Sequence, residues 1–501
     1  MNNIIKSLFT LLIVCSLNCF SQQGINNLWI EGYGNDSVVL PFGNTDIDFF
    51  NGNPTITYNI RGQHLAHTHC NISDSLGNLK FYTNGYDIFD ASDSVMLNGD
   101  SISPSSKQNV FPYGLDVPQA NLVIPNPTEN NKYYLFHSTN DAWAYRYCLN
   151  LMYSEIDMTL NNGLGAVTAN KNVILINDSL NLGKIAACKH GNGRDWWVIC
   201  MRSYSNIFYK LLVTPYGISA PDTQAIGQIR KQGWGELKFS SGGTKLGYAQ
   251  ADYVTNGHIE LFDFDRCSGL LSNAQHIIIP QGLSFGGGIE FSPNESLAYV
   301  TNADSIYQFD LYSTDISNSR IIVSVSDGYI DTIMNTNFLV GFMNTKLAPD
   351  GKIYITSGNS THYMSVIDQP DSPGLACNVM QHAVQLPALY FNTLPNHPNY
   401  FLGANGMCNN LGLPIPSKGG AKKIQVFGNP THDKLTLWFP VDKDVGWLEI
   451  YDVNGECIRR ERVSQWSQYK TVDISLFAEG VYFCRMVWPD GEGSVKVVRL
   501  E

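Results

Sequence analysis

The chain has 501 residues, of which 15% are charged, 44% hydrophobic and 12% aromatic. That hydrophobic content excludes a disordered chain, and a charged fraction well below the usual ~25% disfavours a mainly helical protein. Lys plus Arg total 32 against 44 for Asp plus Glu, a formal charge of −12 without any long basic run, so nucleic-acid binding is also disfavoured.

The N-terminus has the pattern of a secretory signal peptide. Lys6 precedes an apolar stretch at 8–17, and Cys19 and Ser21 place small residues at −3 and −1 of a cut before Gln22. This pattern predicts a signal peptide at 1–21 and export of the remainder. A lipoprotein anchored through Cys19 is the weaker alternative, because the residues before it do not form a lipobox. No other apolar run reaches the ~20 residues of a membrane-spanning helix, so we expect no transmembrane segment.

The body, residues 22–408, contains repeated strand–turn–strand units. Phe239, Phe291 and Leu347 occupy matching slots, which gives spacings of 52 and 56 residues. The three clearest units are 237–248, 289–300 and 346–355, and looser copies lie at 73–82, 123–136 and 186–199. A period near 50 with short strands predicts an all-β fold, a β-propeller of about seven blades, with six as the alternative. We expect 27–32 to pair with strands after Ala376 and so close the ring.

Three charged residues are the candidate binding residues of this ring. Lys238, Glu290 and Lys346 fall in the matching slot of three successive units. They could form a polar binding ring facing the central channel. The favoured alternative is pairing between blades, Lys238 with Glu290 and Glu290 with Lys346, because buried charges are usually paired.

A histidine cluster is a weak candidate for a metal site. His67 and His69 share one face of a strand, whereas His64 points away. Two histidines alone do not complete a zinc site, so the favoured interpretation is structural and we expect no metal.

Two carboxylate pairs and one serine motif suggest chemistry without completing it. Asp46 with Asp48 and Asp263 with Asp265 do not fit an EF-hand loop. We expect them to cap strand ends and turns; calcium is the alternative, and no other cofactor is expected. Residues 282–286 match the G-x-S-x-G pattern but lack the strand–turn–helix context of a nucleophile elbow.

Nine cysteines follow the predicted signal peptide, and export would place them in an oxidising compartment. Nine is odd, so at least one stays free or pairs between chains. Our predicted bridges are Cys377 with Cys408 and Cys457 with Cys484. The alternative is that most cysteines are buried and inert.

A linker at 409–423, rich in Gly and Pro, precedes a compact all-β module at 424–501. Short alternating strands with turn residues between them predict a small β-sandwich. The expected strands are 434–439, 447–451, 481–487 and 494–500.

Three ordered motifs in this module carry a resemblance to a known family. Blocks 427–435, 448–455 and 473–483 resemble, in order, the motifs of the type A C-terminal sorting domain of the type IX secretion system, although Gly428 stands where the family usually has Pro. The matching residues are Asn429, Pro430, Asp433, Asp452, Gly455, Gly480 and Tyr482.

That resemblance implies an address. It implies passage across the inner membrane through the signal peptide and across the outer membrane through the tail. The partners would be the type IX machinery and its processing enzyme, which usually removes the tail. The protein would then be secreted or held on the outer surface of a Gram-negative bacterium.

The body also resembles the propeller-like region that precedes such sorting domains in secreted surface proteins. The matching stretches are 72–85, 153–158, 348–354 and 394–400. This second resemblance implies a fold and an address but no chemistry.

Without an assembled catalytic set, the leading hypothesis is a non-enzymatic module for adhesion or for binding a protein or glycan. Trp196 and Trp197 could serve as glycan platforms, although such aromatics more often fill the contacts between blades. The alternative is a secreted polysaccharide hydrolase or lyase with its site at the channel mouth.

Overall fold

The computed structural model of this chain describes residues 24–34, 40–105, 114–141, 148–230, 232–251, 256–280, 287–392, 394–405, 408, 420–421, 424–427, 431–453, 456–489 and 491–500. The chain divides into two compact units, Met1–Gly403 and Ala404–Glu501. In the described residues of both units the regular structure is β-strand, apart from two short 3₁₀ turns, η1 (Asn161–Gly163) and η2 (Gly374–Cys377). The predicted all-β fold is confirmed.

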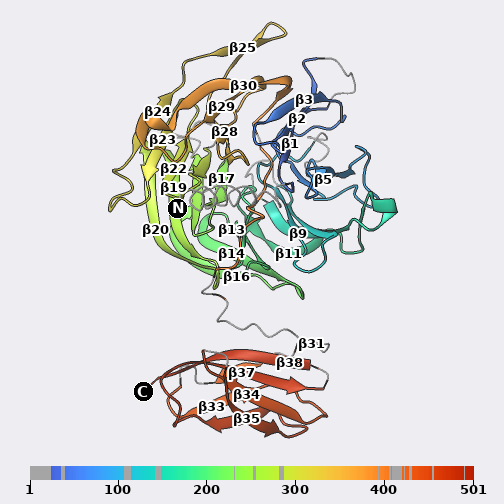
Figure 1. The fold of residues 1–501 in the computed structure, drawn as a ribbon, viewed down its shortest axis with the longest axis vertical. Helices are drawn as coiled ribbons and strands as arrows, with labels where there is room; N and C mark the ends of the chain where they lie inside the picture. The colour runs from blue at the N-terminus through green and yellow to red at the C-terminus, as the bar shows by residue number, and fades with distance from the viewer. Residues whose placement is uncertain are drawn as a thin grey trace, which may run out of the picture. The chain divides into compact units, whose positions relative to one another are not determined.

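The first unit is a β-propeller whose sheets follow one another around a central axis (Figure 1). Its described residues form seven sheets of three to five antiparallel strands, which we number as blades 1 to 7 in chain order. Blade 1 comprises β1 (Leu28–Tyr33), β2 (Gly43–Asp48) and β3 (Thr55–Asn59), and blade 2 comprises β4 (Cys70–Ser73), β5 (Leu79–Thr83) and β6 (Ile88–Asp90). Blade 3 comprises β7 (Asn121–Pro125), β8 (Lys132–Ser138), β9 (Cys148–Asp157), β10 (Ala166–Val167) and β11 (Val173–Leu180). Blade 4 comprises β12 (Ala186–Lys189), β13 (Trp196–Met201), β14 (Ser205–Thr214), β15 (Gly217–Ile218) and β16 (Asp222–Arg230).

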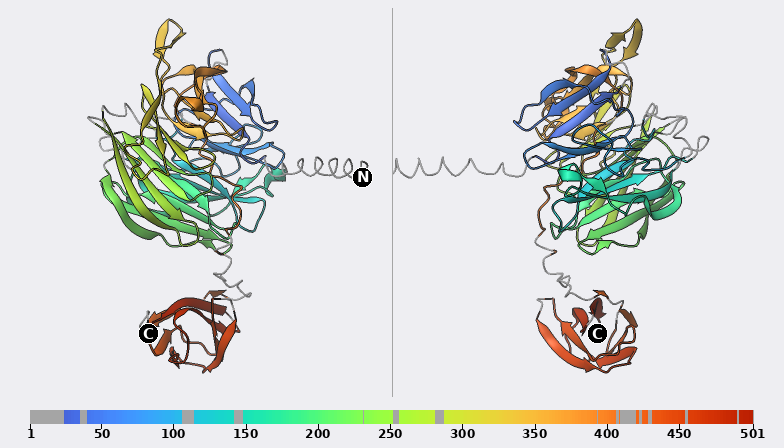
Figure 2. Two further views of the ribbon diagram at one scale, coloured as in Figure 1. Left: turned by 60° about the vertical axis from the view of Figure 1, so that its left-hand side comes forward. Right: turned by 90° about the vertical axis from the view of Figure 1, so that its right-hand side faces the viewer.

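Blades 5 to 7 complete the ring, and one hairpin stands apart from it. Blade 5 comprises β17 (Gly235–Phe239), β18 (Lys245–Ala251), β19 (Asn256–Asp265) and β20 (Leu270–Pro280). Blade 6 comprises β21 (Ile289–Phe291), β22 (Leu297–Thr301), β23 (Ser305–Asp310) and β24 (Ile321–Val325). Blade 7 comprises β27 (Thr345–Leu347), β28 (Ile353–Ile355), β29 (Thr361–Ile367) and β30 (Val379–Tyr390). The hairpin of β25 (Ile330–Ile333) and β26 (Thr336–Leu339) projects from this end of the propeller (Figure 2). The first strands of neighbouring blades contact one another, β17 with β12 and β21 for example, and so line the axis.

The turns that the sequence predicted use left-handed backbone. Gly243 and Gly351, with φ of 71° and 81°, provide it without steric cost in the first hairpins of blades 5 and 7. In blade 6 the same position is held by Glu295, with φ of 61°. Its carboxylate accepts hydrogen bonds from the Gly242 nitrogen (2.7 Å) and the Thr244 hydroxyl (3.0 Å). The strained residue therefore also ties the turn of blade 6 to that of blade 5.

Every blade shares a hydrophobic cluster with the next. Blades 2, 3 and 4 form one cluster; the other clusters join blades 1 and 2, 4 and 5, 5 and 6, 6 and 7, and 7 and 1. Successive residues of one strand serve opposite neighbours: in β1, Leu28 and Ile30 pack against blade 2 and Trp29 against blade 7. Because both faces of each sheet are covered, the strands need few charged residues, which accounts for the low charged fraction.

The ring closes differently from our prediction. β1 pairs with β2, from Leu28 opposite Asp48 to Tyr33 opposite Gly43, and β30 pairs with β29. Blades 1 and 7 are joined by side-chain packing, in which the ring centroids of Trp29 and Tyr354 lie 5.6 Å apart, and by a hydrogen bond from the Leu389 nitrogen to the Pro41 carbonyl (2.8 Å). The prediction that 27–32 would pair with strands after Ala376 is therefore wrong. The nearby segment 43–48 offers β1 a partner at a smaller loop-closure cost, but its polar composition concealed a strand.

The second unit is the predicted small β-sandwich. One sheet has the order β31-β38-β37-β34-β35 and the other β32-β33-β36, around a core that includes Leu437, Leu448 and Met486. The strands are β31 (Gly420–Ala421), β32 (Gln425–Phe427), β33 (Lys434–Trp438), β34 (Gly446–Tyr451), β35 (Cys457–Val463), β36 (Tyr469–Asp473), β37 (Gly480–Trp488) and β38 (Gly491–Arg499).

We expect Trp29→Ala to lower the free energy of unfolding of the propeller by about 3–5 kcal/mol, because it opens a cavity where the first and last blades meet. Chemical denaturation measures the change in residues 22–501, the chain without its predicted signal peptide, which we call the mature chain. Tyr216→Ala is the control, since Tyr216 is 64% exposed, and it should change stability by less than about 0.5 kcal/mol. Equal effects of both variants would contradict closure through Trp29.

Candidate functional site

A short segment that follows the last blade fills the centre of the propeller. We call residues 394–403 the plug. The Asn396 side chain donates hydrogen bonds to the carbonyl oxygens of Asn121 (3.0 Å) and Ile185 (2.9 Å), which belong to blade 3 and to the residue preceding blade 4. Asn396 is only 7% exposed. One amide group thus joins two blades beneath the mouth of the channel.

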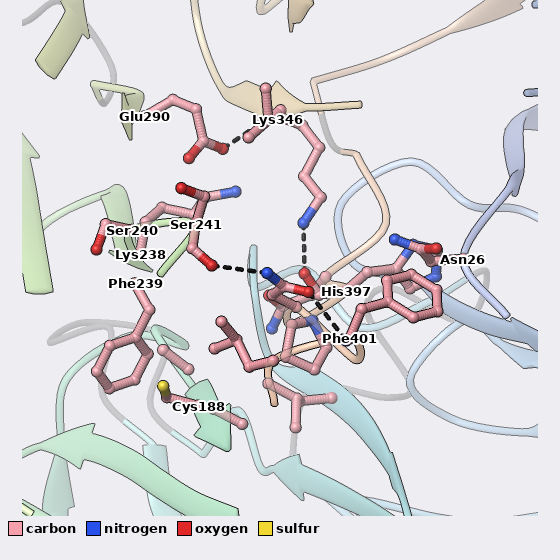
Figure 3. A pocket seen from close by; sticks show the side chains of 18 of the residues that line it. Asn26, Cys188, Lys238, Phe239, Ser240, Ser241, Glu290, Lys346, His397 and Phe401 are labelled. Carbon is pink, nitrogen blue, oxygen red and sulfur yellow. Dashed lines mark hydrogen bonds between the residues drawn. The ribbon is translucent and has the colours of Figure 1, made fainter. Parts of the chain in front are cut away.

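The next plug residue joins two further blades. His397 donates through Nε2 to the carbonyl oxygen of Asn71 in blade 2 (2.8 Å) and accepts a hydrogen bond at its own carbonyl from Nζ of Lys346 in blade 7 (Figure 3). Burial, followed by the charge of Lys346, lowers the pKa of His397 well below its ordinary value. The ring is therefore neutral at pH 7 and acts as a structural donor.

The end of the plug is anchored by side chains as well. The Tyr400 hydroxyl donates to the carbonyl oxygen of Val123 (2.8 Å), and Asn399 donates to that of Ser241 (2.6 Å). Together these bonds connect the plug to blades 2, 3 and 7 and to the turn within blade 5.

The structure brings Lys238, Glu290 and Lys346 together beside the plug, around a cavity of about 230 Å³ that all three line (Figure 3). Each is less than 10% exposed. Lys238 forms an ion pair with Glu236 on its own strand (3.2 Å), and its Nζ also donates to the Thr345 carbonyl (3.0 Å). The expected pairing of Lys238 with Glu290 is replaced by this partner.

Glu236 is a site residue that sequence reasoning missed. Its Oε2 accepts hydrogen bonds from the backbone nitrogens of Ile289 (3.2 Å) and Thr345 (3.0 Å), so it bridges blades 5, 6 and 7. Burial raises the pKa of Glu236, against the lowering by Lys238. Its position two residues before Lys238, on the same strand face, was the available signal.

Glu290 and Lys346 connect the last two blades. Glu290 accepts a hydrogen bond from the Leu347 nitrogen (2.9 Å). Burial, then repulsion by Lys238, lowers the pKa of Lys346 to about 8. The cavity is thus bordered by charges that already have partners within the fold.

The cavity is also lined by a thiol, an aromatic ring and two hydroxyls. Cys188 lines it, but burial raises the pKa of that thiol to about 12, so it is not a thiolate at neutral pH. Phe401, 40% exposed, lies at its rim. The hydroxyls of Ser240 and Ser241, which also line the cavity, are engaged by the Lys245 nitrogen (3.0 Å) and the Pro293 carbonyl (2.6 Å).

The predicted histidine pair does not converge on one point. His67 faces Asp116, with 3.3 Å between Nε2 and Oδ1, whereas His69 faces the buried Glu31 at 3.4 Å. Burial, opposed by Asp116, lowers the pKa of His67. Within the described part of the chain no group of three or more His, Cys, Asp and Glu side chains is placed to hold a metal.

The carboxylate pairs act locally. Asp46 forms an ion pair with Arg61 (2.5 Å) and Asp263 one with Lys245 (3.0 Å). Asp48 accepts from the Phe50 nitrogen and Asp265 from the Cys267 nitrogen, both at 2.9 Å, as turn-capping residues do. Residues 282–286 lie outside the described part of the chain.

Both tryptophans pack between blades. Trp196 is 1% exposed in the cluster of blades 2 to 4, and Trp197 is 8% exposed in that of blades 4 and 5. Neither presents an open ring face on which a glycan could stack. Both instead fill the contacts between blades, the alternative given by the sequence.

Both predicted disulfides are wrong. Cys267 and Cys408 are the disulfide-bonded residues, whereas Cys377, Cys457 and Cys484 are free thiols. Among the free cysteines of the described residues only Cys457 is exposed; the buried ones are Cys70, Cys148, Cys188, Cys200, Cys377 and Cys484. Spacing along the chain could not reveal this, because a disulfide requires Cα atoms within ~7 Å.

The described sorting-motif residues build turns of the β-sandwich. Asp452 accepts from the Glu456 nitrogen (2.9 Å), the Tyr482 hydroxyl donates to the Ala478 carbonyl (2.6 Å), and Gly480 has φ of 149°. The Asp433 carbonyl accepts from the Ile474 nitrogen (2.7 Å). Asn429, Pro430 and Gly455 lie outside the described residues, as does the predicted signal peptide.

Comparison with known families identifies this second unit. Residues 425–498 match the model of the secretion system C-terminal sorting domain. The tail is a type IX sorting domain. The protein is therefore handled by the type IX secretion system and is secreted or placed on the outer cell surface. None of the helices in the described residues is long and apolar enough to cross a membrane.

Several solved structures of other proteins follow a chain course similar to that of the body. A quinoprotein alcohol dehydrogenase-like protein from Bacteroides thetaiotaomicron shares 12% identity, with 74% of this chain and 76% of that one covered and a TM-score of 0.36. A protein from Lactobacillus plantarum shares 12% identity, with 74% of this chain and 99% of that one covered and a TM-score of 0.41. A dihydro-heme d1 dehydrogenase shares 13% identity, with 90% of this chain and 75% of that one covered and a TM-score of 0.37. No curated protein matches the chain. These distant likenesses say nothing about activity.

We expect Asn396→Ala to lower the free energy of unfolding by about 2–3 kcal/mol, because it leaves two buried carbonyl groups without their donor. Chemical denaturation checks this value. Asn130→Ala removes an amide from an exposed residue and should cost less than about 0.5 kcal/mol. If Asn396→Ala proved as mild as its control, the plug would not hold the ring.

We expect deletion of residues 424–501 to prevent the protein from reaching the medium or the cell surface. Immunoblots of periplasm, surface and medium should show it retained in the periplasm. Tyr469→Ala, at a tail residue that is 68% exposed, is the control and should be exported normally. Export of the truncated chain would contradict the role of the sorting domain.

Proposed function

We propose that the exported propeller is a non-enzymatic module that binds a protein or glycan at the face on which the plug emerges. The observation that carries the proposal is the position of Phe401. This exposed aromatic residue borders both the cavity of Lys238, Glu290 and Lys346 and a second, larger cavity beside it. An exposed aromatic between two polar hollows is a common element of recognition surfaces.

The bonding of the charged residues supports binding over catalysis. A hydrolase or lyase would need an acid and a base able to exchange protons with a substrate. Glu290, which lines the first cavity, and Glu236, the ion-pair partner of Lys238, accept backbone hydrogen bonds from neighbouring blades. The plug also crosses the place where side chains of several blades would converge on a substrate.

The test is binding of the mature chain to an array of glycans and surface proteins, followed by titration of any retained ligand. We expect Phe401→Ala to weaken that binding by about tenfold, equivalent to about 1.4 kcal/mol, by removing the exposed ring. Tyr312→Ala is the matched control, an aromatic 75% exposed in blade 6, and should leave binding unchanged. Turnover of a polysaccharide without any retained ligand would overturn the proposal.

A further inference from the structure

The larger cavity beside the plug has a volume of about 660 Å³, within the usual range of ligand sites. It lies among the first turns of blades 2, 3 and 4, from which Asp74, Asn130 and Arg194 contribute, and is bounded by Tyr400 and Phe401 of the plug. We call it the basic cavity.

Its lining is positive in a chain whose formal charge is −12. Lys80, Lys189 and Arg194 line it against one acid, Asp74. Arg194 is neutralised by the buried Asp195 (2.7 Å). Asp74 is occupied by its own turn, where Oδ1 accepts from the nitrogens of Leu76 (2.8 Å) and Asn78 (3.0 Å). Asp74 keeps its charge, which acts on Lys80, so the two lysines together with Asp74 leave the lining with a net positive charge.

Both lysines are held over aromatic rings. Nζ of Lys80 lies 6.0 Å from the centre of the Tyr133 ring, and Nζ of Lys189 lies 5.3 Å from that of Trp196. These rings are 3% and 1% exposed. They offer no open face on which a neutral sugar could stack, and instead they fix the positions of two ammonium groups.

Two further polar groups of the lining are Lys189 and Ser73. Lys189 donates to the Gly193 carbonyl (3.2 Å), and burial, followed by repulsion from Arg266, lowers its pKa; a bound anion would favour the charged form. Ser73, which also lines the cavity, is completely buried, and its Oγ has no hydrogen-bond partner among the described residues. A buried hydroxyl without a partner is costly, so a ligand or water is expected there.

We propose that the basic cavity binds an anionic saccharide, a carboxylated or sulfated sugar, through Lys80 and Lys189. This inference rests on the proposed binding function and names its ligand class. The lysines would neutralise the carboxylate or sulfate, while the exposed Asn130 would bond sugar hydroxyls. The place of the protein outside the cell makes such polymers accessible to it.

The test is calorimetric titration of the mature chain with three tetrasaccharides: a galacturonate oligomer, a sulfated chondroitin oligomer and neutral cellotetraose. At least one anionic probe should bind, the neutral one should not, and binding should weaken as NaCl rises. Lys80→Gln should weaken binding about tenfold, the effect of one charge-assisted hydrogen bond. Lys80→Gln/Lys189→Gln should abolish it. Lys245→Gln, which removes the same charge from the Asp263 pair in blade 5, should bind as the unmodified chain does.

Equal binding of the neutral and anionic probes, or unchanged binding by Lys80→Gln, would overturn this inference. Because Lys189 is half-buried, the single Lys80→Gln variant decides the matter if the double variant does not fold. If the array yields only neutral or protein ligands that depend on Phe401, the anionic-saccharide inference fails and the binding function stands. If nothing binds at all, both fail.

Discussion

The rest of the propeller depends on the plug. A ring of sheets leaves backbone and polar groups facing its axis, and these must have partners if they are buried. Residues 394–403 provide them: Asn396 satisfies carbonyl groups of Asn121 and Ile185, His397 bonds Asn71, and Lys346 bonds the carbonyl of His397. The plug therefore stabilises the arrangement of the blades around their axis.

The plug also borders both of the cavities in which we propose that ligands bind. By occupying the centre it divides its face into two cavities that share Phe401. The smaller cavity is bordered by Lys238, Glu290 and Lys346, whose charges are engaged by Glu236 and by backbone groups. The basic cavity is bordered by Lys80 and Lys189, which lie over buried aromatic rings. The charges around the first cavity are therefore engaged within the scaffold, and the second is the cavity in which we propose that a ligand binds.

Burial accounts for the thiols as well. Outside the cell, exposed cysteines would be open to oxidation. Six of the free cysteines are buried, and burial raises the pKa of Cys70 and Cys188 to about 12. A thiol that stays protonated and inaccessible does not exchange with disulfides, so the core can retain cysteines as small apolar residues.

The sequence by itself determined the features that local patterns encode. The turn signals and period near Phe239, Phe291 and Leu347 predicted the propeller, and the ordered tail motifs predicted the sorting domain, because turns and strand alternation depend on neighbouring residues. Only the tertiary structure decided the ring closure through Trp29, the free state of Cys377 and the pairing of Lys238 with Glu236. It alone decided that 394–403, of which the sequence marked only 394–400 as a stretch resembling the propeller-like region, lies at the centre of the propeller. The contacts of Trp29 with Tyr354 and of Asn396 with Asn121 join residues hundreds of positions apart. The energies of all these contacts, that of Lys238 with Glu236 included, depend on which groups are excluded from water, which no local pattern specifies.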